Sequence, residues 1–158
     1  GALKVTAVDI SAEAVRMADH NAKINGVDKI MKGLEANVFD LLSQLVNDKN
    51  KDYDFIILDP PAFTKSKEAT KNAMKGYREI NMKGLKLVED GGYFATCSCS
   101  HFMTEELFIK TVKEAAKAVH KRLRQIEFRT QAPDHPILWA ADESYYLKFL
   151  IFQVVDEK

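Results

Sequence analysis

The chain has 158 residues, of which 46% are hydrophobic and 29% charged, and its 23 basic and 23 acidic side chains give a formal net charge of zero. This composition suits one folded domain over residues 1–158 and excludes wholesale disorder, while a stand-alone nucleic-acid binder would usually be basic. No apolar stretch reaches the ~20 residues of a membrane span, and no signal-peptide layout is seen, so a cytoplasmic protein without membrane contact is expected.

The first half of the chain alternates between strand and helix patterns. Ser11 is a typical N-cap residue and Asn25-Gly26 a typical helix end, so a helix is predicted between them. The continuous apolar run over residues 53–58 is typical of a strand buried on both faces of a parallel sheet. The other elements expected in this half are strands over residues 3–8 and 32–37 and a helix over residues 39–46.

The second half continues the alternation and then changes. A long helix is predicted from about Glu68 to Glu89, where Asp90-Gly91-Gly92 should end it, and Thr104 should cap another helix. The tail carries two strand patterns without a helix between them, and we expect these two strands to pair antiparallel. The strands expected in this half cover residues 93–97, 125–130 and 145–155.

This order predicts an α/β fold with a doubly wound, Rossmann-like sheet, mostly parallel, with an antiparallel pair at one edge. A nucleotide-type cofactor in such a fold normally binds at a glycine-rich turn after the first strand. Gly1 stands directly before what reads as the second strand. We therefore expect the first strand and its glycine loop to lie upstream, so that the domain is N-terminally truncated.

Two polar side chains follow the first two expected strands. Asp9 precedes a helix, and an acid in this position accepts hydrogen bonds from the ribose hydroxyls of a bound nucleoside. A helix-capping aspartate is the alternative. Asn37 follows the next strand, where its amide can reach an adenine, but taken alone an ordinary turn asparagine is the better reading.

The segment Asp59-Pro60-Pro61-Ala62-Phe63 follows the apolar strand over residues 53–58. The strand places the carboxylate at the sheet edge where ligands bind, the two prolines keep the backbone out of a helix, and Phe63 supplies an aromatic face. Such a loop can hydrogen-bond the polar edge of a base and stack on its ring. The alternative is a rigid turn, for which one proline usually suffices.

The segment Thr96-Cys97-Ser98-Cys99-Ser100 closes the next parallel strand. A thiolate that adds to C6 of a pyrimidine makes C5 able to attack an electrophilic methyl group; a base then removes the C5 proton and the thiol leaves. Cys99, further into the loop, is the better candidate for this thiol, and two buried core cysteines are the alternative. The pair suits neither a disulfide nor a zinc site, so no metal is expected.

Two further residues are candidate substrate contacts. Lys65, in the loop after Asp59, is placed to meet a phosphate. His135 lies in the polar loop over residues 131–136, although a lone loop histidine more often has no catalytic role.

Taken together, these motifs make the chain resemble the bacterial large-subunit ribosomal RNA cytosine-C5 methyltransferases, a class I S-adenosylmethionine-dependent family whose members carry an N-terminal PUA domain. The matching segments cover nearly the whole chain in the same order. They are Val8-Asp9-Ile10-Ser11, Asn37-Val38-Phe39, Leu58-Asp59-Pro60-Pro61-Ala62-Phe63, Gly76-Tyr77-Arg78-Glu79-Ile80-Asn81-Met82, Ser98-Cys99-Ser100 and Asp134-His135-Pro136.

The resemblance implies a role for each candidate residue. Cys99 matches the family nucleophile, and Cys97 stands where relatives can carry an apolar residue. Asn37 occupies a position where the family often has aspartate. The residues implied to bind S-adenosylmethionine are Asp9, Ile10, Asn37, Val38 and Asp59; Asp59 also counts as catalytic, and those implied to contact substrate are Pro60, Pro61, Phe63, Lys65 and His135.

The expected activity is therefore methyl transfer from S-adenosylmethionine to C5 of a cytosine in large-subunit ribosomal RNA, through a covalent cysteine adduct. Ribosomal RNA and an upstream PUA-type domain are the expected partners, and a homodimer is left open. Methylation of an exocyclic amine or another base position in RNA or DNA is one alternative, because similar Asp-Pro-Pro loops serve that chemistry. A cofactor-incompetent RNA-binding module is the other, since no glycine loop is present.

Overall fold

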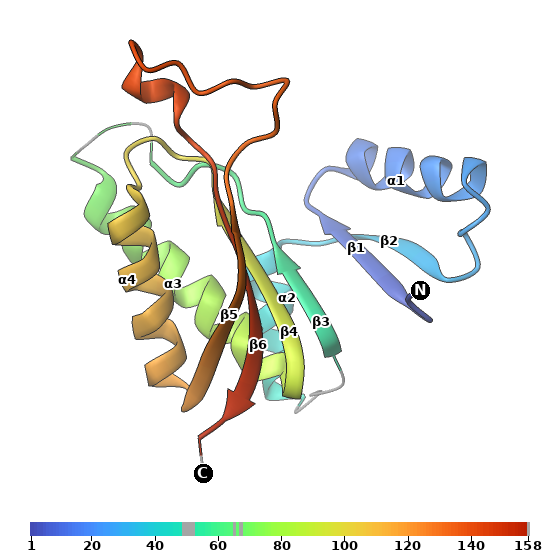
Figure 1. Ribbon diagram of the computed structural model, residues 1–158. Helices are drawn as coiled ribbons and strands as arrows, with labels where there is room; N and C mark the ends of the chain where they lie inside the picture. Colours follow the sequence, from blue (N-terminus) through green and yellow to red (C-terminus); the bar gives the residue numbers. More distant parts are fainter. Residues whose placement is uncertain (49–52, 65, 67, 158) are drawn as a thin grey trace. The chain divides into compact units, whose positions relative to one another are not determined.

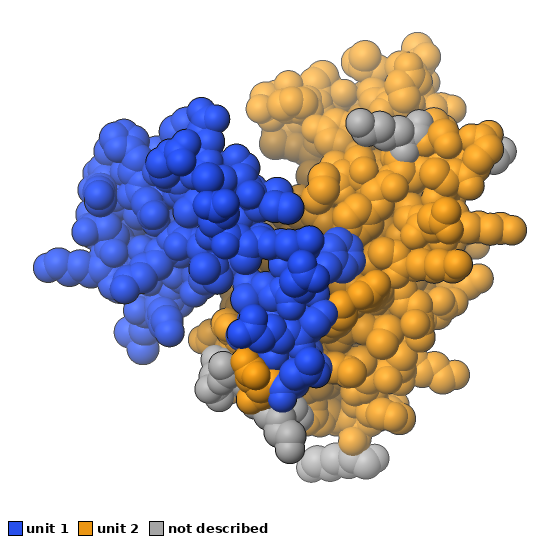
Figure 2. Space-filling view, turned by 180° about the vertical axis from the view of Figure 1, so that it is seen from behind, with its two compact units in different colours: residues 1–47 blue, residues 48–158 orange. Residues whose placement is uncertain are grey.

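A computed structural model describes residues 1–48, 53–64, 66 and 68–157 of the chain. The chain divides into two compact units, residues 1–47 and residues 48–158, which are coloured separately in Figure 2 and are taken in turn below. In the described part of the chain, no helix combines the length and the apolar character needed to cross a bilayer.

The first unit contains a two-stranded parallel sheet (Figure 1). Ser11 is the N-cap of the helix between the strands and accepts a hydrogen bond from the Ala14 amide at 3.3 Å, and Gly26 adopts a positive φ of 68° just after the C-cap, Asn25. Both helix ends predicted from the sequence are thus confirmed. The elements are β1 Val5–Asp9, α1 Ala12–Ile24, β2 Met31–Glu35 and α2 Val38–Asn47.

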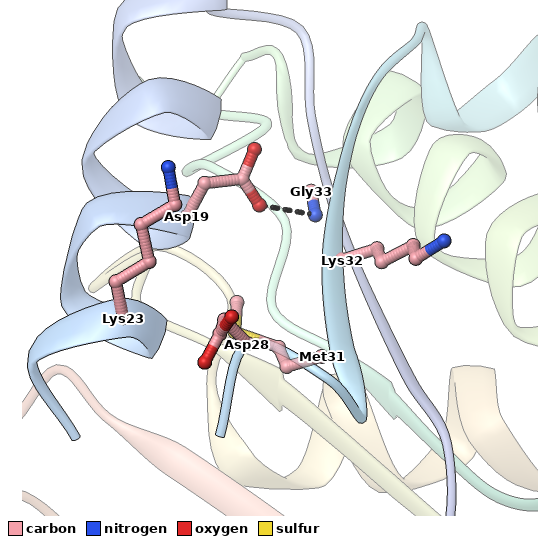
Figure 3. Close-up of a pocket in the computed structure, with 6 residues that line it drawn as sticks. All are labelled: Asp19, Lys23, Asp28, Met31, Lys32 and Gly33. Carbon is pink, nitrogen blue, oxygen red and sulfur yellow. Dashed lines mark hydrogen bonds between the residues drawn. The ribbon is translucent and has the colours of Figure 1, made fainter. Parts of the chain in front are cut away.

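Gly33 lets α1 pack closely on β2. Its amide donates to Asp19 Oδ1 at 2.7 Å, and a Cβ at this position would lie 2.7 Å from Val15 Cγ1. A shallow hollow of about 280 Å³ opens beside this contact (Figure 3). Its lining mixes charges of both signs and comes from α1, the turn after it and the first residues of β2: Asp19, Lys23, Asp28, Met31, Lys32 and Gly33.

The second unit contains a four-stranded sheet in the order β3-β4-β6-β5. β3 pairs parallel with β4, and β6 pairs antiparallel with both β4 and β5. The strands of the tail therefore pair antiparallel as predicted, and β6 lies inside the sheet rather than at its edge. The bounds are β3 Tyr53–Leu58, β4 Val88–Ser98, β5 Lys121–Arg129 and β6 Lys148–Asp156.

Two helices, α3 Thr70–Leu87 and α4 Glu105–Ala118, lie on the same face of this sheet (Figure 1). Thr104 caps α4 as predicted, accepting from the Leu107 amide at 3.3 Å. The core between the helices and the sheet contains fully buried side chains from both layers: Tyr77, Ile80, Leu85, Phe94, Phe108, Val112, Leu150 and Val154.

Two sequence predictions for this unit differ from the structure. β3 is not buried on both faces, because the helices of the unit cover only one face and β3 is an edge strand; Phe55 and Ile57 are 48% and 60% exposed. The long helix ends at Leu87, and Asp90-Gly91-Gly92 lies within β4, where a positive φ of 85° at Gly91 accompanies a register shift against β3. Glycine absorbs this irregularity without the steric penalty of a Cβ.

Candidate active site

The two loops singled out from the sequence meet at one edge of the second unit's sheet. Leu58 pairs with Thr96 in the parallel ladder, so Asp59, the residue after β3, lies beside Cys97, which is still within β4. The Cys97 thiol donates to Asp59 Oδ1 at 3.0 Å and lies 3.5 Å from the Leu58 carbonyl oxygen. The start of the loop after β3 is therefore hydrogen-bonded to the end of β4.

The two cysteines differ in access and in chemistry. Cys97 is 3% exposed, whereas Cys99 is half-buried, and neither is in a disulfide. Burial raises the pKa of the Cys97 thiol well above its ordinary value, and the hydrogen bond to the Asp59 carboxylate and the charge of that group raise it further. Cys97 is thus a protonated hydrogen-bond donor near neutral pH, and Cys99 is the more accessible thiol. The sequence reasoning missed the contact between Cys97 and Asp59. It follows from the pairing of Leu58 with Thr96, because Asp59 and Cys97 are the next residues along the two parallel strands.

The turn that carries Cys99 is fixed on both sides of this residue. Ser98 Oγ donates to the Tyr77 hydroxyl at 2.9 Å, and Ser100 Oγ donates to the Thr64 carbonyl oxygen at 2.9 Å. Both serines are buried, so these bonds are shielded from water. Cys99 therefore lies between two residues that buried hydrogen bonds hold in place.

Tyr77 is a buried residue of α3 whose ring packs against the loop after β3. Its side chain is 0% exposed, and its ring centre lies 4.5 Å from that of Phe63 and 5.5 Å from that of Phe108. Burial is also the main reason why the pKa of the Tyr77 hydroxyl is raised. A Cβ at Gly76 would lie 3.3 Å from Phe63 Cδ2, so α3 and the loop after β3 are closely packed. Phe63 is half-buried by these contacts, while Pro60 is buried and Pro61 exposed.

The long loop between β5 and β6 lies at the same end of the sheet as the loops after β3 and β4 (Figure 1). Its His135 has a side chain that is 62% exposed, with Nδ1 3.3 Å from Asp134 Oδ2 and the ring centre 6.4 Å from that of Tyr146. In the described part of the chain, no hydrogen bond or ion pair joins His135 to Asp59 or Cys99. The predicted substrate contact of His135 stays a prediction, and Lys65 lies outside the described residues.

Lys148 is a residue of this edge that the sequence reasoning missed. It is 2% exposed, and Nζ donates to the Ser100 carbonyl oxygen at 2.6 Å and to the Tyr146 carbonyl oxygen at 2.7 Å. Burial lowers the pKa of Lys148 to about 8. A lysine inside the apolar run over residues 147–152 was the available signal, because charged side chains are rarely buried without a specific partner.

The first unit brings the predicted cofactor residues to the carboxyl edge of its own sheet. Asp9 pairs with Glu35, and the Ala36 amide donates to the Asp9 carbonyl oxygen at 3.0 Å, so the segments after β1 and β2 are adjacent. The Asp9 side chain is exposed and accepts from the Ser11 amide at 2.7 Å. Ile10 is 71% exposed. The hollow of Figure 3 includes the start of β2, the opposite end of this strand from Asn37.

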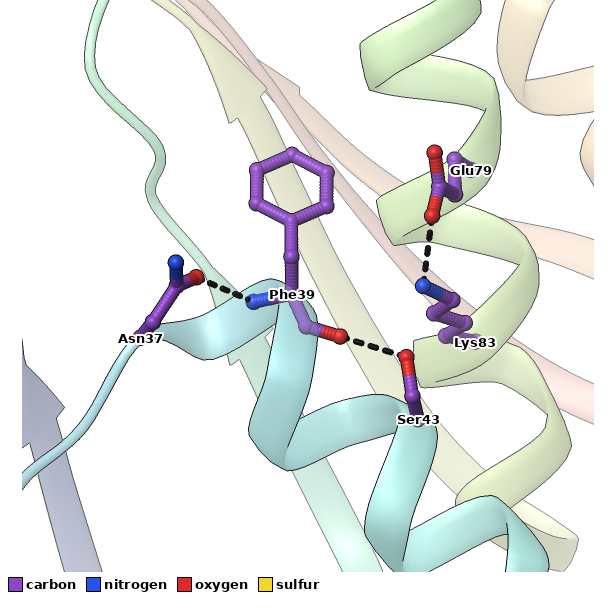
Figure 4. Close-up of polar contacts among 5 residues, drawn as sticks. All are labelled: Asn37, Phe39, Ser43, Glu79 and Lys83. Carbon is purple, nitrogen blue, oxygen red and sulfur yellow. Dashed lines mark hydrogen bonds and ion pairs between the residues drawn. The ribbon is translucent and has the colours of Figure 1, made fainter.

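Asn37 has the turn role that the sequence indicated as the alternative to adenine binding. Its amide nitrogen is in addition left without a partner among the described residues. Its Oδ1 accepts from the Phe39 amide at 3.0 Å at the start of α2, and Ser43 Oγ donates to the Phe39 carbonyl oxygen at 2.6 Å (Figure 4). Among the described residues, the Asn37 amide nitrogen has no hydrogen-bond acceptor. Val38 is the first residue of α2 and is half-buried.

Figure 4 also draws an ion pair on α3, in the second unit. Lys83 Nζ lies 2.5 Å from Glu79 Oε1, four residues earlier on the helix. Such pairs on a helix surface stabilise it by a few tenths of a kcal/mol, about 0.2–0.5 kcal/mol per pair. This pair stabilises α3 locally.

Residues 1–150 match the family described as Methyltransferase domain. The chain belongs to this family. Ribosomal RNA large subunit methyltransferase I of Alteromonas mediterranea is 41% identical over 158 residues, which cover 99% of this chain and 40% of that protein. The protein of the same name from Shewanella denitrificans is 42% identical over 155 residues, which cover 98% of this chain and 39% of that protein. The methyltransferase domain thus spans about two fifths of the length of these curated relatives.

Among solved structures, SMU.776, described as a methyltransferase complexed with SAH, matches with a TM-score of 0.81 and 22% identity, over 97% of this chain and 40% of that one. The α/β fold class predicted from the sequence is confirmed. Membership of the methyltransferase domain family agrees with the enzyme class and with the cofactor, S-adenosylmethionine, that we predicted.

The predicted cofactor residues of the first unit expose groups that are compatible with this cofactor, and their contacts with it stay predictions. Asp9 has an exposed carboxylate, Ile10 an exposed apolar side chain, and Asn37 an amide nitrogen that has no acceptor among the described residues. In the described part of the chain, no group of three or more His, Cys, Asp or Glu side chains is arranged to hold a metal ion.

Proposed function

We propose that this methyltransferase domain transfers a methyl group from S-adenosylmethionine to C5 of a cytosine in large-subunit ribosomal RNA through a covalent bond to Cys99. The observation that carries the proposal is the position of Cys99: an accessible thiol on a rigid turn that is hydrogen-bonded to the loop of Asp59. The names of the relatives support ribosomal RNA as the substrate.

Cys99 and Asp59 take part directly in the proposed chemistry. The Cys99 thiolate adds to C6 of the cytosine, and the electron pair that becomes available at C5 takes the electrophilic methyl group that S-adenosylmethionine supplies. A base then removes the C5 proton, and the electrons of that C–H bond re-form the C5–C6 double bond as the Cys99 sulfur leaves. Asp59, exposed beside Cys97, is positioned for hydrogen bonds to the polar edge of the cytosine.

Cys97 has a supporting role in the proposal. Its thiol stays protonated and donates to one oxygen of Asp59, which leaves the second carboxylate oxygen available to the cytosine. Pro60 is buried and fixes the backbone between Asp59 and Phe63, whereas Pro61 is exposed. The Phe63 ring packs against the Tyr77 ring, so the loop that contacts the cytosine has its conformation before the cytosine binds.

The proposal is tested with the intact protein and large-subunit ribosomal RNA. Cys99→Ala should lower methyl transfer by at least about 10³-fold, because the covalent nucleophile is removed. Digestion of the product RNA to nucleosides and mass spectrometry should identify 5-methylcytidine in the parent reaction. Normal turnover by Cys99→Ala, or an N-methylated nucleoside as the product, would refute the thiol mechanism and favour methylation of an exocyclic amine.

A trapping experiment adds a control that does not depend on turnover. RNA with 5-fluorocytosine at the target should stay covalently bound to the parent protein, because no base can remove fluorine from C5 in place of the proton. Cys99→Ala should form no such adduct, and thermal denaturation should show that this variant is folded. An upstream PUA-type domain, a homodimer and the contacts of Lys65 and His135 with substrate stay predictions.

A further inference from the structure

Lys148 is the only charged side chain in the buried core of the described residues. It is the first residue of β6, and its backbone pairs antiparallel with Ser98, the residue before Cys99. The strand pairing therefore brings a buried ammonium group to the turn that carries the thiol.

The hydrogen bonds of Lys148 join two loops of the candidate site. Nζ donates to the Ser100 carbonyl oxygen at 2.6 Å and to the Tyr146 carbonyl oxygen at 2.7 Å. Ser100 directly follows Cys99, and Tyr146 belongs to the segment that leads from the loop of His135 into β6. The same ammonium thus fixes the turn of Cys99 and the end of the long loop.

The charge of Lys148 is incompletely balanced by these contacts. An ammonium has three N–H donors, and both observed acceptors are neutral carbonyl oxygens. In the described part of the chain, no carboxylate forms an ion pair with Nζ. A buried charge is stable only with a nearby opposite charge or a full set of hydrogen bonds, so this site favours an anion beside it.

The groups around Lys148 identify that anion. Two acidic groups that raise the pKa of Lys148 lie near the ammonium: Cys99, after β4, and Glu105, at the start of α4. Glu105 is already engaged, because Oε2 accepts from the Tyr145 hydroxyl at 3.0 Å. Tyr145 itself stays neutral, since burial raises its pKa to about 12, and Tyr77 of α3 has a pKa that burial raises as well. Cys99, in contrast, lies between Ser98, which pairs with Lys148, and Ser100, whose carbonyl oxygen accepts from its ammonium, so the strand geometry points to Cys99 as the anion.

We propose that Lys148 is a positioning residue for methyl transfer, whose ammonium holds the Cys99 turn through the Ser100 carbonyl and balances the charge of the Cys99 thiolate. The inference rests on the proposed role of Cys99. The Cys99 thiol releases its proton to solvent, Lys148 keeps its own proton, and the thiolate then forms the bond to C6. A clamp that acts only on the backbone is the alternative, and the two differ in how the thiol titrates.

The test measures the rate at which iodoacetamide alkylates Cys99 in the intact protein between pH 6 and 10, with mass spectrometry to locate the modified cysteine. Lys148→Met removes the charge and the hydrogen bonds, while Lys148→Gln removes the charge and keeps an N–H donor. Both should move the midpoint of the pH profile upward by at least about one pH unit, because a nearby opposite charge lowers the pKa of an acidic group by about that much. Lys148→Arg should restore most of the shift.

An unmoved midpoint in folded Lys148→Met or Lys148→Gln would overturn the proposal and leave a backbone clamp. If neither neutral variant folds, Glu105→Gln decides, since it removes a competing negative charge and should move the midpoint downward; an unchanged midpoint again overturns the proposal. Alkylation requires no methyl transfer, so its result is separate from that of Cys99→Ala. A shifted profile with full activity of Cys99→Ala would refute the proposed function and leave the electrostatic contact intact.

Discussion

The edge around Cys99 and the edge around Asp9 are held in different ways. At the first, hydrogen bonds connect residues far apart in the chain: Cys97 to Asp59, Ser100 to Thr64, and Lys148 to Ser100. At the second, Asp9 and Asn37 each bond to a backbone amide two residues further on. The edge around Cys99 is thus fixed by contacts between distant parts of the chain, and the side chains at the edge around Asp9 by local turns.

This difference predicts how substitutions will act. A change among the buried groups near Cys99 disturbs packing and chemistry together, because the same side chains support both. A change at Asp9 or Asn37 removes a predicted ligand contact from an exposed surface and leaves the core untouched. Substitutions at Asp9 or Asn37 should therefore change ligand binding with little effect on stability, whereas substitutions near Cys99 should change both.

The largest effect is expected at Tyr77. Tyr77→Ala should destabilise the protein by about 3–5 kcal/mol, because it empties a fully buried aromatic site between Phe63 and Phe108. Tyr77→Phe keeps the ring and loses the hydrogen bonds of the hydroxyl with Ser98 and with the Phe63 backbone, so it should cost about 1–2 kcal/mol. Urea unfolding of the intact protein gives both values, and equal costs for the two variants would contradict the packing argument.

A smaller effect, confined to binding, is expected at Asp9. Asp9→Ala should weaken S-adenosylmethionine binding by about 10- to 100-fold in calorimetric titration, the loss of a charge-assisted hydrogen-bond pair. Asp9→Asn, which keeps the shape and one acceptor oxygen, should lose less. If affinity is unchanged in both variants while stability falls, Asp9 acts only as the local cap that its bond to Ser11 suggests.

The two N-caps offer a matched comparison between the units. Ser11 and Thr104 each accept one backbone amide at 3.3 Å, so each change to Ala should cost about 1 kcal/mol of helix stability. Native-state hydrogen exchange should confine the effect of Ser11→Ala to α1. Thr104→Ala should increase exchange in α4 and in its packing partner α3; an effect restricted to α4 would show that the second unit is less cooperative than its contacts indicate.

The smallest change is expected at Cys97. Its raised pKa and its burial should keep it unmodified by iodoacetamide from pH 7 to 9 in the folded protein, while Cys99 reacts. The direction follows because a thiol with a raised pKa stays protonated, and hence unreactive, to higher pH. Urea should make both thiols reactive, and mass spectrometry can locate each modification. Early labelling of Cys97 under native conditions would contradict its contact with Asp59.

Much of this arrangement could be predicted from local sequence patterns. The caps at Ser11 and Thr104 and the strand over residues 53–58 follow from residue preferences that act over a few positions. The end of the long helix was wrong, because Asp90-Gly91-Gly92 can end a helix or bend a strand, and pairing with β3 decides between them. Local rules do not contain that pairing.

The candidate site divides in the same way. The order of the strands was enough to bring Asp59 and the cysteines to one edge, because parallel strands end together. Lys148 was missed, since its place beside the Cys99 turn depends on the antiparallel pairing of β6 with β4, between residues 50 positions apart in the chain. A lysine in an apolar strand signals a special environment without naming its partner.

The position of β6 has a consequence for the order in which the protein can assemble during synthesis. β5 has no strand partner other than β6 in the sheet of the second unit, yet β6 is the last of the described strands to leave the ribosome. Until then β5 and β4 keep unpaired edges, which expose the nascent chain to wrong pairing with other strands. Because Lys148 arrives with β6, the turn of Cys99 acquires this restraint only after β6 has been made, later than the strands β3, β4 and β5.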